Sequence, residues 1–259
     1  MIKIGSPLFI LRDKCKEDLM TVLGRLAEIG YDGIEFLGLF GHKASDIKNT
    51  LDSLNVKAIG DHVGYNEFVN ETDKVIDVHK ELGCGYITVG SPFSSGDEYG
   101  KIIDNFNKLG EAMNKAGMKL LFHNHREEVV ITENGKSILD NLMDDTNPDS
   151  VFLEPDLGWA QIGGADPAHY VRKYYNRCPV IHFKDFIPTK DGFLFRPTGY
   201  GVVDNAGLYT LSLACDPLPE WFVMDHDHAY DRDIYDDLKL SLMYFKDLMN
   251  ITETEKAVY

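Results

Sequence analysis

The sequence predicts a single-domain α/β protein, a (β/α)8 TIM barrel, from its hydrophobic pattern, its length and its lack of nucleotide-binding motifs. Short apolar runs alternate with segments of helical periodicity along the chain, and this order predicts a parallel sheet. The 259 residues match the usual size of one such barrel. An open doubly wound sheet is the second choice, because no G-x-G-x-x-G follows the first strand and no P-loop occurs.

Eight segments have the length and composition of buried strands, spaced by about 30 residues as βα units require. The predicted strands are residues 2–5, 33–37, 56–62, 86–90, 118–123, 151–156, 180–184 and 221–225.

Two of the intervening segments show how the predicted helices are recognised. Apolar residues of segment 19–29 recur on one helical face before Gly30, and those of segment 102–113 do so before Gly117. The G-G-A-D-P run at 163–167 predicts a loop followed by a helix with an aspartate cap and a proline in its first turn. We expect residues 1–250 to form the barrel and the polar residues 251–259 to form a tail.

The composition indicates an ordered, cytoplasmic protein. Hydrophobic residues make up 44% of the chain, and no apolar run approaches the roughly 20 residues that span a bilayer. The apolar stretch at the N-terminus is broken by Arg12, too early for a secretory signal. The cysteines are scattered and form no C-x-x-C pair, which argues against disulfides and thiolate zinc sites: Cys15, Cys84, Cys178 and Cys215.

The formal net charge of −16 excludes nucleic acid as an expected partner, because no basic stripe offsets it locally. The same charge disfavours a multiply phosphorylated substrate. Among the polar positions of interest, only Arg126, Lys184 and Arg196 are cations. We therefore expect no nucleic acid and no membrane partner, and a homo-oligomer is compatible with the sequence.

Polar side chains gather at the carboxyl ends of the predicted strands, where barrel enzymes carry their chemistry. Any one of them by itself is typical of a capping or hydrogen-bonded loop residue. Together they would bury competing charges, which a divalent cation satisfies, and mixed imidazole and carboxylate ligands suit Mn, Co, Zn or Fe better than calcium. These residues are Glu35, His62, His123, His125, Glu154, Asp156, His182, Lys184, Asp225 and Asp227.

Three short patches carry most of these residues. In H-N-H-R-E-E at 123–128, two histidines face the same way, so one is expected to bind metal while His125 or Glu128 handles a proton. In E-P-D-L-G-W at 154–159, Asp156 is a candidate ligand and Trp159 an apolar wall. In I-H-F-K-D at 181–185, Lys184 is either catalytic or paired with a neighbouring carboxylate, for which Asp185 and Glu154 are the candidates.

These patches resemble the xylose-isomerase-like TIM-barrel family of sugar phosphate isomerases and epimerases, especially the branch with H-N-H-x-x-E on strand five. In that family four ligands from strands five to eight hold a divalent metal (Mn, Co, Zn, Fe or Mg). The resemblance places them at His123, Asp156, His182 and Asp225. Many relatives have glutamate at the positions of His123 and Asp225, and the shorter Asp225 is expected to weaken the site or to admit a water. The matching motifs are G-Y-D-G-I-E-F at 30–36, H-N-H-R-E-E at 123–128, D-L-G-W at 156–159, G-G-A-D-P at 163–167, H-F-K-D at 182–185 and W-F-V-M-D-H-D at 221–227.

The resemblance implies an isomerase or epimerase of a small sugar or keto-sugar, with or without a phosphate, that removes an α proton and stabilises an enediolate. The alternatives are a lyase or dehydratase of a keto-sugar, keto-glycoside or inosose, and a non-catalytic sugar-binding or partner subunit with a degraded metal site. The related endonuclease activity is disfavoured by the acidic charge. The predicted catalytic residues are His125, Glu128, Lys184 and Glu35, and the predicted substrate contacts are His62, Glu154, Trp159 and Asp227.

Overall fold

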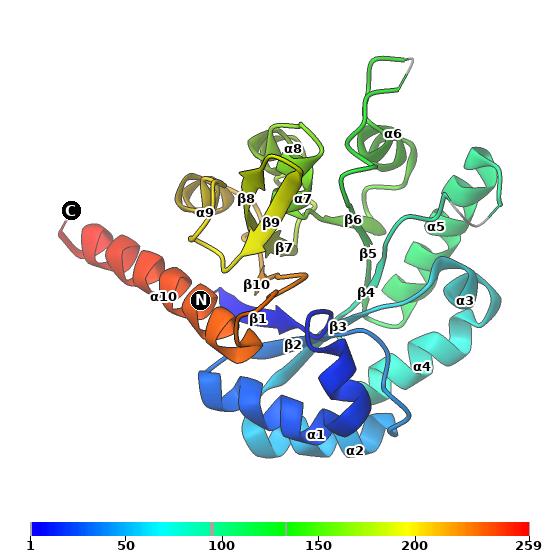
Figure 1. The fold of residues 1–259 in the computed structure, drawn as a ribbon. Coiled ribbons are helices and arrows are strands. Elements are labelled where there is room, and N and C mark those ends of the chain that lie inside the picture. The colour runs from blue at the N-terminus through cyan, green and yellow to red at the C-terminus, as the bar shows by residue number, and fades with distance from the viewer. Residues whose placement is uncertain (1, 94–95, 133, 259) are drawn as a thin grey trace.

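The eight predicted strands form a closed parallel barrel with helices around it, as the ribbon in Figure 1 shows. The structure is a computed structural model that describes residues 2–93, 96–132 and 134–258, with side chains described up to residue 250. The barrel strands are β1 (Lys3–Pro7), β2 (Gly33–Phe36), β3 (Lys57–His62), β4 (Tyr86–Val89), β5 (Lys119–His123), β6 (Val151–Glu154), β7 (Val180–Phe183) and β10 (Trp221–Met224).

The barrel closes at a narrow seam between β6 and β7. Every other neighbouring pair is joined by a ladder of at least three registered residues, and the order is β6-β5-β4-β3-β2-β1-β10-β7. Beyond the end of β6, the Asp156–His182 bridge completes the circle, and the His182 backbone N–H donates to the Pro155 carbonyl at 3.0 Å. The seam therefore lies directly at two of the predicted site residues.

The predicted helix boundaries are confirmed at the two places where a glycine or a capping aspartate marked them. Helix α1 ends at Gly30, whose left-handed φ of 103° suits glycine. Helix α8 begins with Pro167, and the Asp166 carboxylate accepts from the Ala168 N–H, as the cap prediction requires. The helices are α1 (Arg12–Ile29), α2 (Ala44–Leu54), α3 (Tyr65–Asn70), α4 (Thr72–Leu82), α5 (Tyr99–Lys115), α6 (Ile138–Asp145), α7 (Leu157–Ile162), α8 (Pro167–Lys173), α9 (Asn205–Ser212) and α10 (Ile234–Val258).

Within the described part of the chain, no helix combines the length and the apolar character that a membrane span needs. Helix α10 continues through residues 251–258, whose side chains lie outside the description, so the expected boundary before residue 251 stays a prediction. The four cysteines are free and buried, in agreement with the absence of a disulfide framework.

Apolar side chains close the amino-terminal half of the barrel. Ile59, Leu121, Val180, Trp221 and Val223 form a buried cluster with neighbours from the first halves of their strands. A Cβ atom on the β2 residue Gly33 would lie 2.5 Å from the Trp221 ring, so glycine is required beside this indole. Because apolar side chains fill the amino-terminal half of the barrel, the polar groups of its interior gather at the carboxyl end.

One element was not predicted: the antiparallel hairpin of β8 (Asp185–Thr189) and β9 (Gly192–Arg196) that follows β7. The buried Asp185 carboxylate accepts from the backbone N–H groups of Gly199, Gly201 and Val203 at 3.0 to 3.1 Å. Asp185 is thus an anchor of the loop after the hairpin, and the candidate ion pair with Lys184 is not the one that forms.

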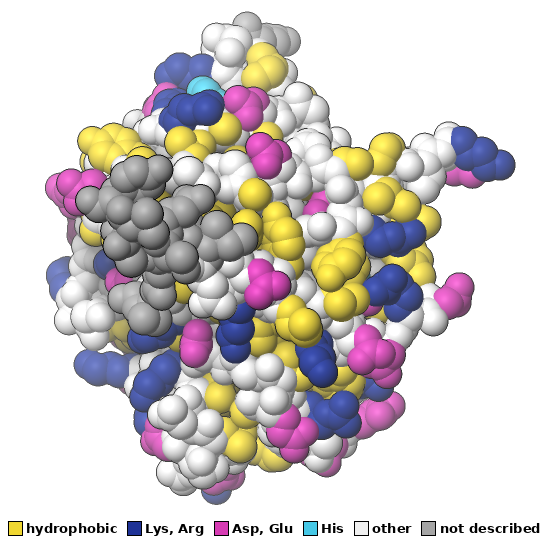
Figure 2. All heavy atoms as spheres, turned by 90° about the vertical axis from the view of Figure 1, so that its left-hand side faces the viewer, with side chains coloured by type: hydrophobic (Ala, Val, Ile, Leu, Met, Phe, Trp, Pro, Cys, Tyr) yellow, Lys and Arg dark blue, Asp and Glu magenta, His cyan; other side chains and the backbone are white. Residues whose placement is uncertain are grey.

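The face of the molecule in Figure 2 mixes acidic, basic and apolar side chains. Helices surround the barrel in Figure 1. The candidate site lies at the carboxyl ends of the strands, where the polar residues gather.

Candidate active site

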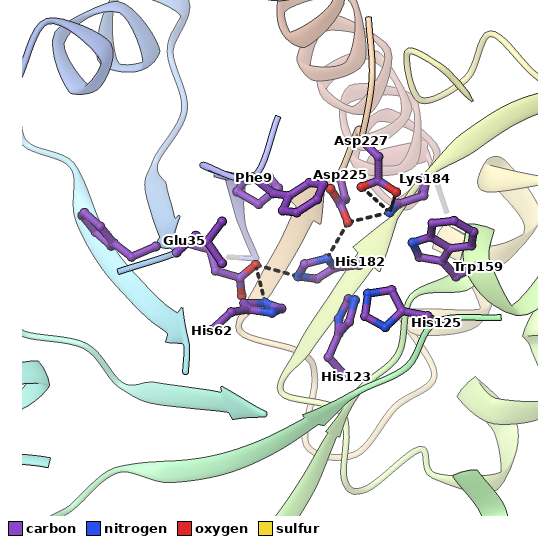
Figure 3. A pocket seen from close by; sticks show the side chains of 13 residues that line it. Phe9, Glu35, His62, His123, His125, Trp159, His182, Lys184, Asp225 and Asp227 are labelled. Carbon is purple, nitrogen blue, oxygen red and sulfur yellow. Dashed lines mark hydrogen bonds and ion pairs between the residues drawn. The ribbon is translucent and has the colours of Figure 1, made fainter. Parts of the chain in front are cut away.

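A cavity of about 130 Å³ lies at the carboxyl ends of the barrel strands. Figure 3 shows its side chains pointing toward one another from β2, β3, β5, β7 and the loops that follow. Most of the predicted site residues line it: Glu35, His62, His123, His125, Trp159, His182, Lys184, Asp225 and Asp227.

Two carboxylates and two imidazoles form the deeper polar group of the cavity. The Nε2 atom of His62 lies 3.1 Å from both Glu35 Oε2 and Glu154 Oε1. The Nε2 atom of His182 lies 2.9 Å from the same Glu35 oxygen and 3.3 Å from the same Glu154 oxygen. Burial would raise the pKa of Glu35, but the two imidazoles outweigh it and hold that pKa below its usual value.

Glu154 does not line the cavity, but it is fully buried beneath it and is held from two sides. Its Oε2 accepts from the Thr88 hydroxyl at 3.0 Å, and its Oε1 lies 3.0 Å from His123 Nδ1. Burial and the nearby charge of Glu35 raise the pKa of Glu154 to about 7. We predicted Glu154 as a substrate contact, whereas its side chain lies beneath the residues that line the cavity.

A second polar group surrounds the buried ammonium of Lys184. Its Nζ lies 3.1 Å from Asp156 Oδ2, 3.0 Å from Asp225 Oδ2 and 2.8 Å from both oxygens of Asp227. The ammonium also lies 5.0 Å from the centre of the Trp159 ring. Burial alone would lower the pKa of Lys184, but the carboxylates, Asp156 first, raise it above its usual value. The candidate partner Glu154 is replaced by these three aspartates.

Asp156 serves two structures at once. Its Oδ1 caps α7 by accepting from the Trp159 N–H at 2.7 Å, while its Oδ2 faces Lys184. Burial raises the pKa of Asp156 to about 7, although the ammonium of Lys184 opposes this. The D-L-G-W motif therefore encodes a helix start and a site residue together.

His125 stands at the mouth of the cavity, with 44% of its side chain exposed. Burial and then the charge of Lys184 lower its pKa, so the imidazole is neutral near pH 7. Glu128 lies behind it, and its buried carboxylate accepts from the His125 backbone N–H at 2.8 Å. Glu128 itself does not line the cavity. Its hydrogen bond to the His125 backbone holds that residue in place.

The residues present fit a divalent cation by donor type and proximity. Two groups offer ligand atoms that all lie within 4.8 Å of one another. Both contain His123 and His182; one adds His62 and Glu154, and the other adds Asp156 and Asp225, which is the predicted ligand set. In the predicted set Asp156 Oδ2 and Asp225 Oδ1 are buried without a hydrogen-bond partner among the described residues, but Lys184 lies close to both carboxylates.

Apart from Trp159, which was expected as an apolar wall, sequence reasoning missed the apolar residues that line the cavity. Pro7, Phe9, Phe36 and Leu37 line it beside the polar groups. Phe9 is 41% exposed, and Figure 3 shows it among the side chains that line the cavity. These residues follow β1 and β2 directly, so strand position was the available signal, but apolar residues there look like ordinary core in a sequence.

Residues 23–211 match the family described as Xylose isomerase-like TIM barrel. The chain belongs to this family. Among curated proteins it is similar to inosose dehydratase of Geobacillus kaustophilus (strain HTA426), with 25% identity over 190 residues, covering 63% of this chain and 61% of that protein. It is also similar to inosose dehydratase of Bacillus cereus (strain AH820), with 22% identity over 78% of this chain and 80% of that protein.

Solved structures of the family share the fold. A sugar phosphate isomerase/epimerase from Parabacteroides distasonis ATCC 8503 superposes with a TM-score of 0.76 at 22% identity, covering 94% of this chain and 93% of that one. This match supports the barrel architecture that the sequence predicted. The chain spans less than two thirds of the length of the Geobacillus kaustophilus relative, so the activity of that protein is a hypothesis for this chain.

Proposed function

We propose that this protein is a metal-dependent enzyme that removes the α proton of a small, neutral keto-sugar or cyclic keto-polyol. The observation that carries the proposal is one cavity with acid/base groups on two sides. Figure 3 shows Glu35 and His125 on opposite sides of the histidines at its centre. A substrate that lies between them has one of these groups on each face of the carbon next to its carbonyl group.

His125 is the proposed base. Its imidazole is neutral because its pKa is lowered, and Glu128 holds its backbone in place. The imidazole takes the α proton, the C–H electrons pass to the carbonyl oxygen, and the Lys184 ammonium stabilises the negative charge that develops there. A divalent cation, held by His182 with neighbouring imidazole and carboxylate groups, supplies further positive charge when bound.

We place elimination of water first among the outcomes. The electrons of the enediolate then expel a β-hydroxyl group, which takes the proton carried by the His125 imidazolium and leaves as water, so His125 returns to its neutral form. The names of the curated relatives, inosose dehydratases from two genera, support this choice. The cyclic inosose ring also suits a cavity with aromatic side chains at its rim, Phe9 and Trp159.

Isomerisation or epimerisation, the activity that the sequence predicted, is the second candidate. The same proton would return to the neighbouring carbon or to the opposite face. Glu35, on the other side of the histidines from His125, supports this candidate, because epimerisation needs groups on both faces.

The charge of the cavity favours a substrate without phosphate. Among the described lining residues Lys184 is the one ammonium or guanidinium group, and Asp156, Asp225 and Asp227 already surround it. A phosphate would therefore meet carboxylates without a spare cation, which costs electrostatic free energy.

Turnover in D₂O followed by NMR tests the proposal. We expect deuterium exchange or product formation with an inosose or another neutral keto-sugar, and a UV-absorbing enone if water is eliminated. Exchange with none of these substrates, in metal-loaded protein, would refute the proposed function. It would favour the non-catalytic sugar-binding alternative.

A matched pair of variants tests the assignment of the base. His125→Gln should lower the exchange rate by about 100-fold or more, and Glu128→Gln should lower it less, because Glu128 acts through the His125 backbone. Equal rates for His125→Gln and the unchanged protein would show that another group is the base.

A further inference from the structure

The loop between β10 and α10 contains a tyrosine in a backbone conformation that bulky residues rarely adopt. We call residues 225–233 the β10–α10 loop; it begins with the site residues Asp225 and Asp227 and leads into α10. Tyr230 in this loop has a φ of 54°, in the left-handed region. Such a conformation costs free energy and persists where surrounding contacts fix it. Tyr230 must therefore be held by its contacts with neighbouring residues.

Tyr230 is held by a ring contact within the loop and by a hydrogen bond to the β8–β9 hairpin. Its ring lies against the ring of His228, with centroids 4.3 Å apart. Its hydroxyl oxygen accepts a hydrogen bond from the Phe195 backbone N–H at 3.1 Å. Phe195 belongs to β9. The tyrosine with the left-handed backbone thus links the β10–α10 loop to the hairpin.

His226 forms a second link from the same loop. Its neighbours Asp225 and Asp227 line the cavity, whereas its own side chain does not and is almost fully buried. Its Nδ1 atom lies 3.0 Å from the Arg196 carbonyl oxygen of β9, and because a carbonyl oxygen only accepts, Nδ1 is the donor. Its Nε2 atom lies 3.4 Å from Asp237 Oδ2 on α10. The imidazole is therefore enclosed between β9 and α10 and fixes the loop to β9.

Phe195, whose backbone N–H binds Tyr230, supports the wall of the cavity. Its ring centroid lies 5.4 Å from that of Trp159, and the ring planes meet at 79°, which is an edge-to-face contact. The Lys184 ammonium lies 5.5 Å from the centre of the Phe195 ring and 5.0 Å from that of the Trp159 ring. A shift of the hairpin would therefore release Trp159 and change the surroundings of the ammonium.

The β10–α10 loop also contacts Lys184 directly. The Lys184 ammonium donates to both oxygens of Asp227 at 2.8 Å, and Figure 3 shows Lys184 between Asp227 and Trp159. The loop thus bounds the ammonium on one side and the aromatic wall bounds it on the other. In the proposed reaction the ammonium must lie beside the carbonyl oxygen, and a displacement of about 1 Å from the reactive geometry can lower a rate by about 100-fold.

We propose that Tyr230 and His226 are positioning residues, which hold the β8–β9 hairpin to the β10–α10 loop and thereby fix Trp159 and the Lys184 ammonium around the substrate. Neither positioning residue lines the cavity, so neither is a catalytic residue. The kinetic consequence rests on the proposed function, because it concerns that reaction. The link between hairpin and loop does not depend on which reaction the site catalyses.

Tyr230→Phe tests the link with no substrate present. The change removes a single oxygen atom and keeps the aromatic ring, so the fold should be retained. We expect hydrogen exchange in peptides covering 192–196 to be about fivefold faster, which corresponds to the loss of one neutral hydrogen bond. Acrylamide should also quench Trp159 fluorescence more strongly, while the second tryptophan, Trp221, is buried and gives a constant background. Tyr175→Phe, at an exposed tyrosine after α8, is the matched control.

Deuterium exchange into the proposed substrate measures the kinetic consequence. Tyr230→Phe should raise KM by about fivefold and change kcat less, because the hydroxyl supports the wall against which the substrate binds. His226→Leu removes the contact next to Asp227 and should lower kcat by about 10-fold or more. His226→Asn keeps an N–H group near the place of Nδ1 and should restore most of that loss. Residues that only stabilise the fold would not divide KM from kcat in this way.

Unchanged hydrogen exchange over 192–196 in Tyr230→Phe would overturn the link for any reaction. Faster exchange with unchanged KM and kcat would overturn the positioning role, and so would equal losses in His226→Asn and His226→Leu. If the unchanged protein turns over no keto-sugar, the proposed function fails. Hydrogen exchange and Trp159 quenching then still decide whether Tyr230 holds the hairpin as proposed.

Discussion

Lys184 differs from an ordinary surface lysine, because its ammonium is buried and is the counter-charge of three aspartates. Removing one partner of a buried ion pair is strongly destabilising, because the remaining charges stay buried. Lys184 therefore supports the cavity as well as the proposed chemistry, and the two roles can be separated by pH.

Lys184→Met should lower the free energy of unfolding by about 3 to 5 kcal/mol at pH 8 in metal-free protein. Without the ammonium, the folded-state pKa of Asp156, which is already raised, rises further, and the lowered pKa of Asp225 rises as well, so the missing stability returns as the pH falls and these carboxylates take up protons. Denaturant unfolding at pH 5 and pH 8 measures the difference. The exposed Lys190→Met is the control, and an equal loss at both pH values would contradict the explanation.

The β8–β9 hairpin is a separate two-stranded sheet outside the eight-stranded barrel, and it supports the cavity. Phe195 of β9 packs against Trp159 at 5.4 Å, so the hairpin supports one wall of the cavity. The hairpin is connected to the following loop through the Asp185 carboxylate and its backbone donors.

Asp185→Asn should destabilise this element and loosen the cavity wall. An amide replaces charge-assisted acceptors and turns its own N–H groups toward backbone donors, so we expect a loss of roughly 3 kcal/mol in unfolding free energy. The KM for the true substrate should rise more than kcat falls. Asp191→Asn in the exposed turn is the control, and similar effects from both changes would rule out the anchoring role.

Helix α4 is joined to β3 by a buried pair, because His79 Nε2 lies 2.8 Å from Asp61 Oδ2 while His79 Nδ1 bonds to the Val75 carbonyl. Burial would lower the pKa of His79, but the hydrogen bond and charge of Asp61 outweigh it and raise that pKa. A raised folded-state pKa means that this stability is fully present below the unfolded-state pKa and is lost as the pH rises through the folded-state pKa.

His79→Gln should therefore cost most stability at acidic to neutral pH and less at alkaline pH. Urea unfolding of both proteins between pH 5 and pH 9 gives the difference directly. A difference that grows toward high pH would show that His79 is not protonated in the folded chain.

At the level of the whole molecule, the β6–β7 seam is the weakest closure of the barrel, and the predicted metal ligands Asp156 and His182 lie on its two sides. A metal ion bound there should hold β6 and β7 together. Hydrogen exchange should slow on Zn²⁺ addition in peptides covering 151–156 and 180–184, and stay unchanged around β4. Uniform slowing of hydrogen exchange across the barrel would indicate that the metal ion stabilises the whole fold and does not link β6 to β7 in particular.

Sequence periodicity predicted each barrel strand to within two residues at either end, because strand and helix patterns are local. The β8–β9 hairpin was missed, although K-D-G between two β-rich runs is a turn signal, since a proline in β8 and the expected helix hid it. The partners of Lys184 were also predicted wrongly. Its aspartates come from after β6 and β10, and their meeting depends on the closure of the barrel.

By itself the sequence determined the barrel, the end of the barrel that carries polar groups, and the residue types that meet there, because all three follow from local pattern and from the direction of parallel strands. Tertiary structure alone decided which atoms face one another. The imidazoles of His62 and His182 contact the carboxylates of Glu35 and Glu154, which lie far apart in the chain. Distances near 3 Å depend on strand register, barrel closure and side-chain packing that no local pattern encodes.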